Sequence, residues 1–236
     1  MNVSVARVVA LCCFSLLPAG LASAAPAAAG EAGAASRATE YEVLRAFPSG
    51  RLSALTENDY PDARGLTGSN RKNGSWLEAG PQRGSCRALI GAVVAGDLAA
   101  ADRAWVGITT AFAHQRADGG FVAEVRPNGA SARSRAASVE TAFFFLQELG
   151  HALLVIRQSP HEAHFRERIA EIEPRLRRAC AFIDAGYDTI IASSGHAVNR
   201  VIIAAKAFGL CGTFLGDEAL VARARELIAF ALTRRD

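Results

Sequence analysis

The stretch Gln115-Arg116-Ala117-Asp118-Gly119-Gly120-Phe121 stands where a long apolar helix is predicted to end, and it decides how the chain around it folds. Two adjacent glycines allow the backbone to reverse, and the preceding Asp can accept a hydrogen bond from its own main chain. A related motif occurs at residues 229–236, where Ala229-Phe230-Ala231 is followed by Arg234-Arg235-Asp236. The stretch therefore predicts a turn that ends one unit of a repeating helical array.

The two copies also begin alike. Gly96-Asp97 precedes the helix that leads into the first turn, and Gly216-Asp217 precedes the last helix. An Asp at this position caps a helix by accepting hydrogen bonds from its first free N–H groups. Because a start signal and a stop signal recur together, the sequence predicts repeated helical hairpins.

Apolar residues at spacings of three and four predict the helices themselves. They cover 86–95, 97–117, 138–158, 160–185, 199–213 and 217 onward, after a short helix over 40–55 that Pro48-Ser49-Gly50 interrupts. No run of alternating β-branched residues competes, so we predict an all-α fold. The polar stretch Asn58–Gly84 reads as a long loop, and Trp76 favours an ordered loop folded over a surface.

The predicted connections are of two kinds. Those at 95–97, 159–161 and 215–217 are tight, whereas those at 58–84, 118–137 and 186–198 are long. In an antiparallel array of helices, alternate connections lie at the same end. All the long connections are therefore expected on one face, which is where a helical scaffold carries its functional residues.

Composition places the chain among globular proteins. It has 236 residues, of which 50 % are hydrophobic and 21 % charged, with a net charge of +3. This is enough material for a sizeable core. No Lys/Arg stripe interleaved with aromatic residues is present, so we predict no nucleic-acid partner.

The N-terminal residues have the pattern of a targeting sequence. Arg7, the apolar segment Val8–Leu17 and the small-residue site Ala22-Ser23-Ala24 predict a signal peptide over 1–24. We therefore expect an exported protein, periplasmic or secreted, with no membrane span after cleavage. Three parts follow: an Ala/Gly-rich linker over 25–38, a short helix and long loop over 39–83, and the helical-hairpin domain over 84–236.

Cleavage would leave three cysteines, Cys86, Cys180 and Cys211. An odd number excludes a full disulfide framework, although one bridge can form. We interpret all three as small apolar fillers on helices. No Cys-x-x-Cys and no Cys/His pair at ligand spacing occurs, and we predict neither a metal site nor a cofactor.

Helical hairpins that end in a Gln-x-x-Asp-Gly-Gly-Phe turn resemble the α/α-toroid proteins, in which inner and outer helices alternate around a ring. The turn is similar to one in terpene cyclases and prenyltransferases of that shape, but no Asp-x-Asp-Asp motif occurs here. An exported chain is more similar to the polysaccharide lyases and glycoside hydrolases of this architecture, including the alginate and heparin lyase families. The resemblance covers 84–236, about half of a ring. A toroid truncated at its C-terminus and a half-toroid with an exposed apolar edge both fit.

Resemblance to the lyases implies β-elimination on an acidic polysaccharide. That chemistry needs a group to neutralise the uronate carboxylate, a base to remove the α-proton, and an acid at the leaving oxygen. The segment from Tyr187 to Arg200 offers such groups: Asn199 and Arg200 to neutralise the carboxylate, and His196 or Tyr187 as base or acid. Lyases often carry an Asn-His pair here, whereas this chain reads His-Ala-Val-Asn-Arg.

Arg126, Glu140 and Trp76 are the predicted substrate-binding residues, on long connections or beside them. Structural roles compete with several of these assignments. Asn199 and Arg200 can cap a helix and pair with a neighbouring Glu, Tyr187 can be a packed loop aromatic, and Glu140 can serve the dipole of its helix. Two other functions remain open: a non-catalytic helical-repeat scaffold that binds a glycan or a protein, and a glycoside hydrolase on the same fold.

Overall fold

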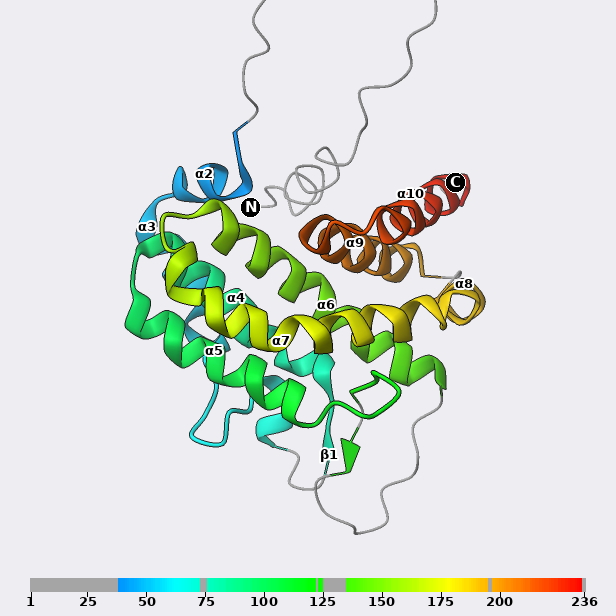
Figure 1. The fold of residues 1–236 in the computed structure, drawn as a ribbon, viewed down its shortest axis with the longest axis horizontal. Helices are drawn as coiled ribbons and strands as arrows, with labels where there is room; N and C mark the ends of the chain where they lie inside the picture. The colour runs from blue at the N-terminus through cyan, green and yellow to red at the C-terminus, as the bar shows by residue number, and fades with distance from the viewer. Residues whose placement is uncertain (1–37, 73–75, 122, 125–134, 195–196, 235–236) are drawn as a thin grey trace, which may run out of the picture. The chain divides into compact units, whose positions relative to one another are not determined.

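The computed structural model describes residues 38–72, 76–121, 123–124, 135–194 and 197–234. Residues 38–236 form one compact unit, and helices dominate its described part, so the predicted all-α class is confirmed (Figure 1). The predicted signal peptide and linker lie outside the described residues.

The described helices follow one another with two short 3-10 turns and one small strand pair among them. The helices are α2 (Glu40–Arg45), α3 (Ser49–Thr56), α4 (Ala79–Ala95), α5 (Leu98–Ala113), α6 (Arg135–Gln158), α7 (Glu162–Asp184), α8 (Tyr187–Ser194), α9 (Val198–Leu215) and α10 (Glu218–Thr233). The 3-10 turns are η1 (Glu57–Asp59) and η2 (Gly68–Arg71). The strands β1 (Trp76–Leu77) and β2 (Ala123–Glu124) pair antiparallel.

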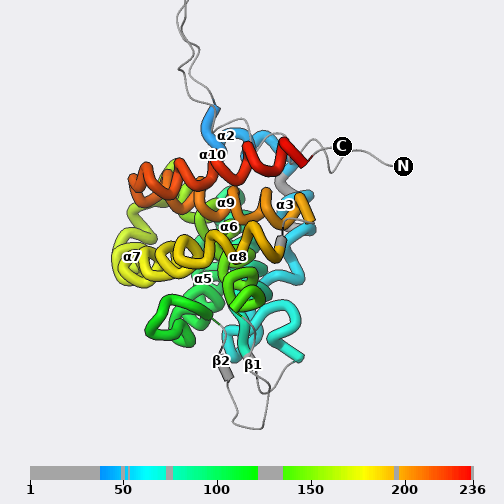
Figure 2. The backbone as a smooth tube through the Cα atoms, turned by 90° about the vertical axis from the view of Figure 1, so that its right-hand side faces the viewer, coloured from blue at the N-terminus to red at the C-terminus, as the bar shows by residue number. Residues whose placement is uncertain are grey.

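Helix α6 lies at the centre of the fold and packs against α2, α4, α7, α8 and α9 (Figure 1). Figure 2 shows α10 alongside α9, far from β1 and β2 in that view. Both α6 and α9 are long and apolar enough to cross a membrane by length and composition alone. In α6 the most apolar window is 78 % buried within the protein, and in α9 it is 50 % buried. The apolar surface of α6 is thus mainly core, whereas α9 is less enclosed than α6.

The capping signals predicted from the sequence are present. Gly96 and Gly216 both have positive φ, 74° and 65°, and each ends a helix in the left-handed conformation. The side chain of Asp97 accepts a hydrogen bond from the N–H of Ala100, and Asp217 caps α10 in the same way. The helices α5 and α10 that follow are 16 residues each. The two copies of the repeat therefore begin with the same backbone geometry.

The N-terminal ends of α4, α6 and α9 meet. The N–H of Gly80 in α4 donates to Thr141 Oγ1 in α6 at 2.8 Å, and Arg200 in α9 pairs with Glu140 in α6 at 3.1 Å. At the other end of α6, Arg157 Nη1 donates to the carbonyl of Phe214, near the end of α9, at 2.7 Å. The contacts of Gly80 and Arg200 thus bring together the helix ends that the long connections enter.

The turn over 115–121 is held from several sides. The N–H of Gly120 donates to Asp118 Oδ1 at 3.0 Å, as the sequence predicts. Gln115 Nε2 donates to the carbonyl of Arg175 in α7 at 2.9 Å. Phe121 is fully buried, with its ring among other core aromatic rings. The turn therefore docks α5 onto α7 and has a structural role.

The structure moves several predicted boundaries. Helix α4 begins at Ala79, so the prediction of a loop up to Gly84 is wrong for its last six residues. Gly80 and Pro81 look like loop residues, but the first turn of a helix tolerates a missing N–H. Gly80 also lies so close to α6 that a Cβ there would sit 2.7 Å from Thr141 Oγ1. The predicted long connection over 186–198 likewise contains a helix, α8.

Candidate functional site

A buried glutamine in α4 organises the segment between α3 and α4. Gln82 has no exposed surface, and its Oε1 accepts from the N–H of Thr67 at 2.7 Å. Its Nε2 donates to the carbonyls of Gly65 and Gly107, at 2.8 and 3.1 Å. Asn70 Nδ2 also donates to this Oε1 at 3.2 Å. One amide thus satisfies backbone groups from the segment and from α5, which fixes the segment on the two helices.

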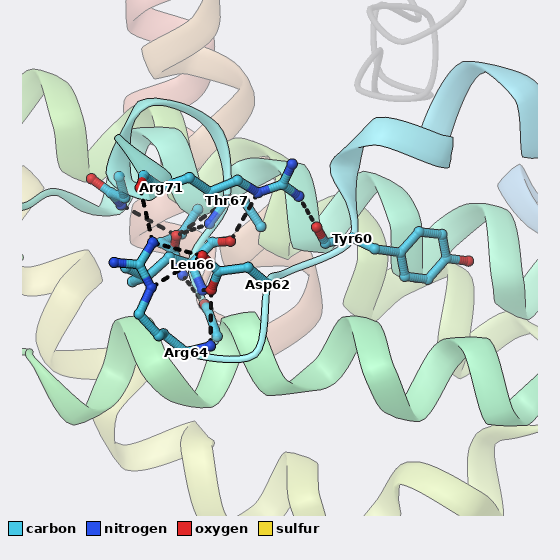
Figure 3. Close-up of polar contacts among 9 residues, drawn as sticks. Tyr60, Asp62, Arg64, Leu66, Thr67 and Arg71 are labelled. Carbon is cyan, nitrogen blue, oxygen red and sulfur yellow. Dashed lines mark hydrogen bonds and ion pairs between the residues drawn. The ribbon is translucent and has the colours of Figure 1, made fainter. Parts of the chain in front are cut away.

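Charged side chains stiffen the same segment from within (Figure 3). Asp62 Oδ1 accepts from the N–H groups of Arg64 and Leu66, at 2.9 and 3.1 Å. Arg64 Nη2 donates to the carbonyl of Arg71 at 2.8 Å, and Arg71 in turn donates to the carbonyl of Tyr60. The described part of the predicted long loop is therefore an ordered, hydrogen-bonded unit.

A cleft of about 470 Å³ opens between this segment and the N-terminal ends of α4 and α6. Its walls carry three carboxylates, two guanidinium groups, small polar residues and one aromatic ring. The lining residues are Asp59, Gly68, Ser69, Glu78, Gly80, Pro81, Arg83, Arg87, Ala137, Glu140, Thr141 and Phe144. We take this polar cleft as the candidate site.

The two arginines of the cleft differ in their surroundings. Arg87 binds Asp59 through two hydrogen bonds of 2.8 Å each. Arg83 lies one turn earlier on α4, with its guanidinium 4.9 Å from the centre of the Phe144 ring. Among the residues that the structure describes, no carboxylate lies within ion-pair distance of Arg83. Burial, followed by the charge of Arg87, lowers the pKa of Arg83. The charges of Glu148 and Asp59 act on Arg83 in the opposite sense. Because neither carboxylate forms an ion pair with it among the described residues, the guanidinium can pair with an incoming anion.

Two of the sequence-predicted site residues come together here. Arg200 and Glu140 form the ion pair between α9 and α6 already described, and Glu140 also lines the cleft. Their side chains are 44 % and 30 % exposed. Asn199, beside Arg200, is exposed at the start of α9. Arg200 therefore has the neighbouring Glu that the structural alternative anticipated, at the rim of the cleft.

Tyr187 is not among the residues that line the cleft. Its ring meets Phe208 edge to face, with centroids 6.3 Å apart, and the Arg223 guanidinium lies 4.4 Å from its centre. Burial raises the pKa of the Tyr187 phenol, and a hydrogen bond with Glu226 raises it further. A tyrosine base must be available as phenolate, and a raised pKa makes that form scarcer. The surroundings of Tyr187 favour the packed-aromatic interpretation.

The remaining predicted residues are placed only in part. His196 and Arg126 lie outside the described residues. The backbone of Trp76 belongs to β1, where it pairs with Glu124, and its side chain lies outside what the structure describes. Within the described part of the chain, no group of three or more His, Cys, Asp or Glu side chains is arranged to hold a metal ion.

Sequence reasoning missed Arg83, Arg87 and Asp59. Arg83 and Arg87 are four residues apart, the spacing that puts two side chains on one face of a helix. That signal was available, but Arg83 fell inside the stretch assigned to a loop. The bond from Arg87 to Asp59 joins residues 28 apart in the sequence, and no local sequence pattern predicts it.

No protein-family model matches the chain, and searches of curated proteins and of solved structures also returned no significant match.

Proposed function

We propose that the cleft binds an acidic carbohydrate and that the protein is an exported carbohydrate-active protein. The observation that carries the proposal is Arg83, a partly buried guanidinium in the cleft without a carboxylate partner among the described residues. A carboxylate on a sugar ring can accept two parallel hydrogen bonds from such a group.

The rest of the cleft suits a sugar ring. Ser69, Thr141 and the carboxylates of Glu78 and Glu140 line its walls and can exchange hydrogen bonds with hydroxyl groups. The Phe144 ring supplies one apolar surface beside Arg83. A polar cleft with a single aromatic face and an available cation fits an acidic sugar better than an apolar ligand.

The proposed fold is a partial α/α toroid built from three hairpins, α4–α5, α6–α7 and α9–α10. Two observations support this arrangement. Each hairpin's helices pack against each other, and the first helices pack side by side in the order α4, α6, α9. The contacts Gly80–Thr141 and Glu140–Arg200 then put the cleft and the start of α9 on the same face.

Acting on its ligand, the protein would carry out β-elimination on an acidic polysaccharide. Arg83 would neutralise the uronate carboxylate and make the α-proton more acidic, with Asn199 and Arg200 along the same face. His196 is the proposed base, in preference to Tyr187, because the phenol of Tyr187 is packed against Phe208 and has a raised pKa.

Glycoside hydrolysis is the second candidate. Glu78 and Glu140 line the same cleft, one from the start of α4 and one from α6. Glycosidases use two carboxyl groups that flank the scissile bond, one as acid and one as base or nucleophile. A non-catalytic glycan-binding scaffold would use the same cleft without turnover.

Binding is tested by titration calorimetry with oligouronates, against neutral oligosaccharides of equal length. The Arg83→Gln variant should bind oligouronates about tenfold more weakly, since a hydrogen bond to a charged group contributes about 1.5 kcal/mol or more. Arg45→Gln is the matched control, because Arg45 is exposed on α2 and does not line the cleft. Equal affinity of the two variants, or no binding of any acidic glycan by the wild type, would refute the proposal.

Turnover is tested by incubating the protein with a panel of uronate polymers. Elimination gives unsaturated products that absorb in the ultraviolet. New reducing ends without that absorbance would indicate hydrolysis, and binding without products would indicate a scaffold.

A further inference from the structure

Helices α7 and α9 run in opposite directions where they meet near the end of α9. Arg177 Nη2 in α7 donates to the carbonyl of Leu215 in α9 at 3.5 Å. Cys180 follows Arg177 by three residues, and Cys211 precedes Leu215 by four. Side chains three or four residues apart lie on one face of a helix, about one turn along its axis. Moving one turn along each helix from this bond therefore brings the two cysteines opposite each other.

The surroundings of the two thiols agree with that placement. Both residues are buried, and neither is in a disulfide in this structure. A hydrogen bond with Cys180, together with burial, raises the pKa of the Cys211 thiol. Cys211 Sγ also donates to the carbonyl of Leu146 in α6 at 3.4 Å, so the side chain has a defined direction.

We propose that Cys180 and Cys211 form a disulfide between α7 and α9 when the chain folds under oxidising conditions, and that Cys86 remains a free thiol. The two S–H groups lose two protons to solvent and two electrons to the oxidant, and one S–S bond forms. With glutathione disulfide as oxidant, its S–S bond breaks and two glutathione thiols are released. The proposal is independent of the ligand of the cleft.

Access and reactivity decide when the bond forms. Cys180 lines a groove of about 530 Å³ between α7 and the start of α10, together with Leu215 and Arg223. Cys211 lies behind it with no exposed surface. A thiol reacts as thiolate, and a raised pKa keeps that form scarce in the native protein. Oxidation is therefore expected during folding, while the two thiols are still accessible, and only slowly in the folded reduced protein.

Cys86 is the internal reference. It lies on α4, which packs against α5 and α6, and it is fully buried. Burial is also the main cause that raises the pKa of its thiol.

The experiment uses the full chain with Cys12→Ser and Cys13→Ser, so that the N-terminal thiols cannot exchange. The reduced protein is unfolded, refolded in a glutathione redox buffer, blocked with N-ethylmaleimide under denaturing conditions and digested without reduction. Before blocking, the intact mass should be lower than that of the reduced protein by two hydrogen atoms. After blocking and digestion, mass spectrometry should find a peptide that links Cys180 to Cys211, and maleimide on Cys86 alone. The same measurement on protein isolated from the periplasm of a bacterial host covers the case of poor refolding.

Two further variants make the outcome specific. Cys86→Ala should keep the linked peptide and lose all maleimide labelling. Cys180→Ala should lose the link and carry maleimide on both Cys86 and Cys211. Maleimide on all three thiols of the oxidatively folded protein, or a bridge that includes Cys86, would overturn the proposal.

Discussion

Replacing Gln82 with Ala tests the claim that one buried amide holds the segment between α3 and α4 in place. The substitution removes the acceptor of the Thr67 N–H and the donor to the carbonyls of Gly65 and Gly107. Thr67 and Gln82 both have no exposed surface, so water does not readily replace the lost partners. The bond from Asn70 Nδ2 is lost as well. At about 1 kcal/mol for each of the three bonds to the backbone, the free energy of unfolding should fall by at least about 3 kcal/mol.

Urea unfolding followed by far-ultraviolet circular dichroism measures this loss. Gln147→Ala is the matched control, because Gln147 is also a buried glutamine in a helix. Its Nε2 donates to the adjacent Glu148 side chain. Within the described part of the chain, truncation therefore breaks no side-chain hydrogen bond to the backbone, and the cost should stay near 1 kcal/mol.

A local response is also measurable. Should the segment detach without global unfolding, the Thr67 amide would exchange with solvent faster while the helices stay protected. The reasoning fails if Gln82→Ala costs no more than Gln147→Ala and the exchange of the Thr67 amide is unchanged.

Two other perturbations address the N-terminal helix and the turns. A hydrogen bond with His151 lowers the pKa of Glu40 below its ordinary 4.5. The stability that this pair contributes, about 1 kcal/mol, should be present above that pH and disappear as the pH falls through the lowered value. Urea midpoints of Glu40→Gln and wild type should therefore differ at neutral pH and converge in acid; a constant difference would contradict this assignment. Gly119→Ala should cost more than about 2 kcal/mol, because φ is 91° and the new Cβ would lie 2.3 Å from the carbonyl oxygen of Arg178. Gly216→Ala, with φ 65° and nothing within 4 Å, should cost only about 1 kcal/mol, and equal losses in thermal unfolding would refute the steric argument.

The helices were predictable because their signals are local. Apolar spacing located α6 and α7, and Asp97 and Asp217 marked the starts of α5 and α10 correctly. The repeat of Gly-Asp before each of these helices corresponds to the same left-handed glycine and the same cap in the structure. These features depend on residues within about one turn of each other, and a single sequence contains them in full.

The start of α4 was not predictable in the same way. Gly80, Pro81 and Gly84 have low helix propensity, and their composition resembles a loop. Tertiary contacts override that preference: Gly80 donates to Thr141 Oγ1, and Gly84 lies so close to Asp59 that a Cβ there would be 3.1 Å from its Oδ1. Because these partners are distant in sequence, the local pattern gives the wrong boundary.

The candidate site also has one part that the sequence predicted and another that only the structure shows. The sequence alone predicted that Glu140 and Arg200 belong to one face, and the structure joins them in an ion pair. The sequence does not show that Arg87 is paired with Asp59, or that the Arg83 guanidinium packs against the Phe144 ring. Whether an arginine of the cleft forms an ion pair depends on which segments of the chain pack beside its helix. Helix periods and caps are short-range properties that the sequence determines by itself. The pairing of these partly exposed charges is decided only when the tertiary structure brings distant helices together.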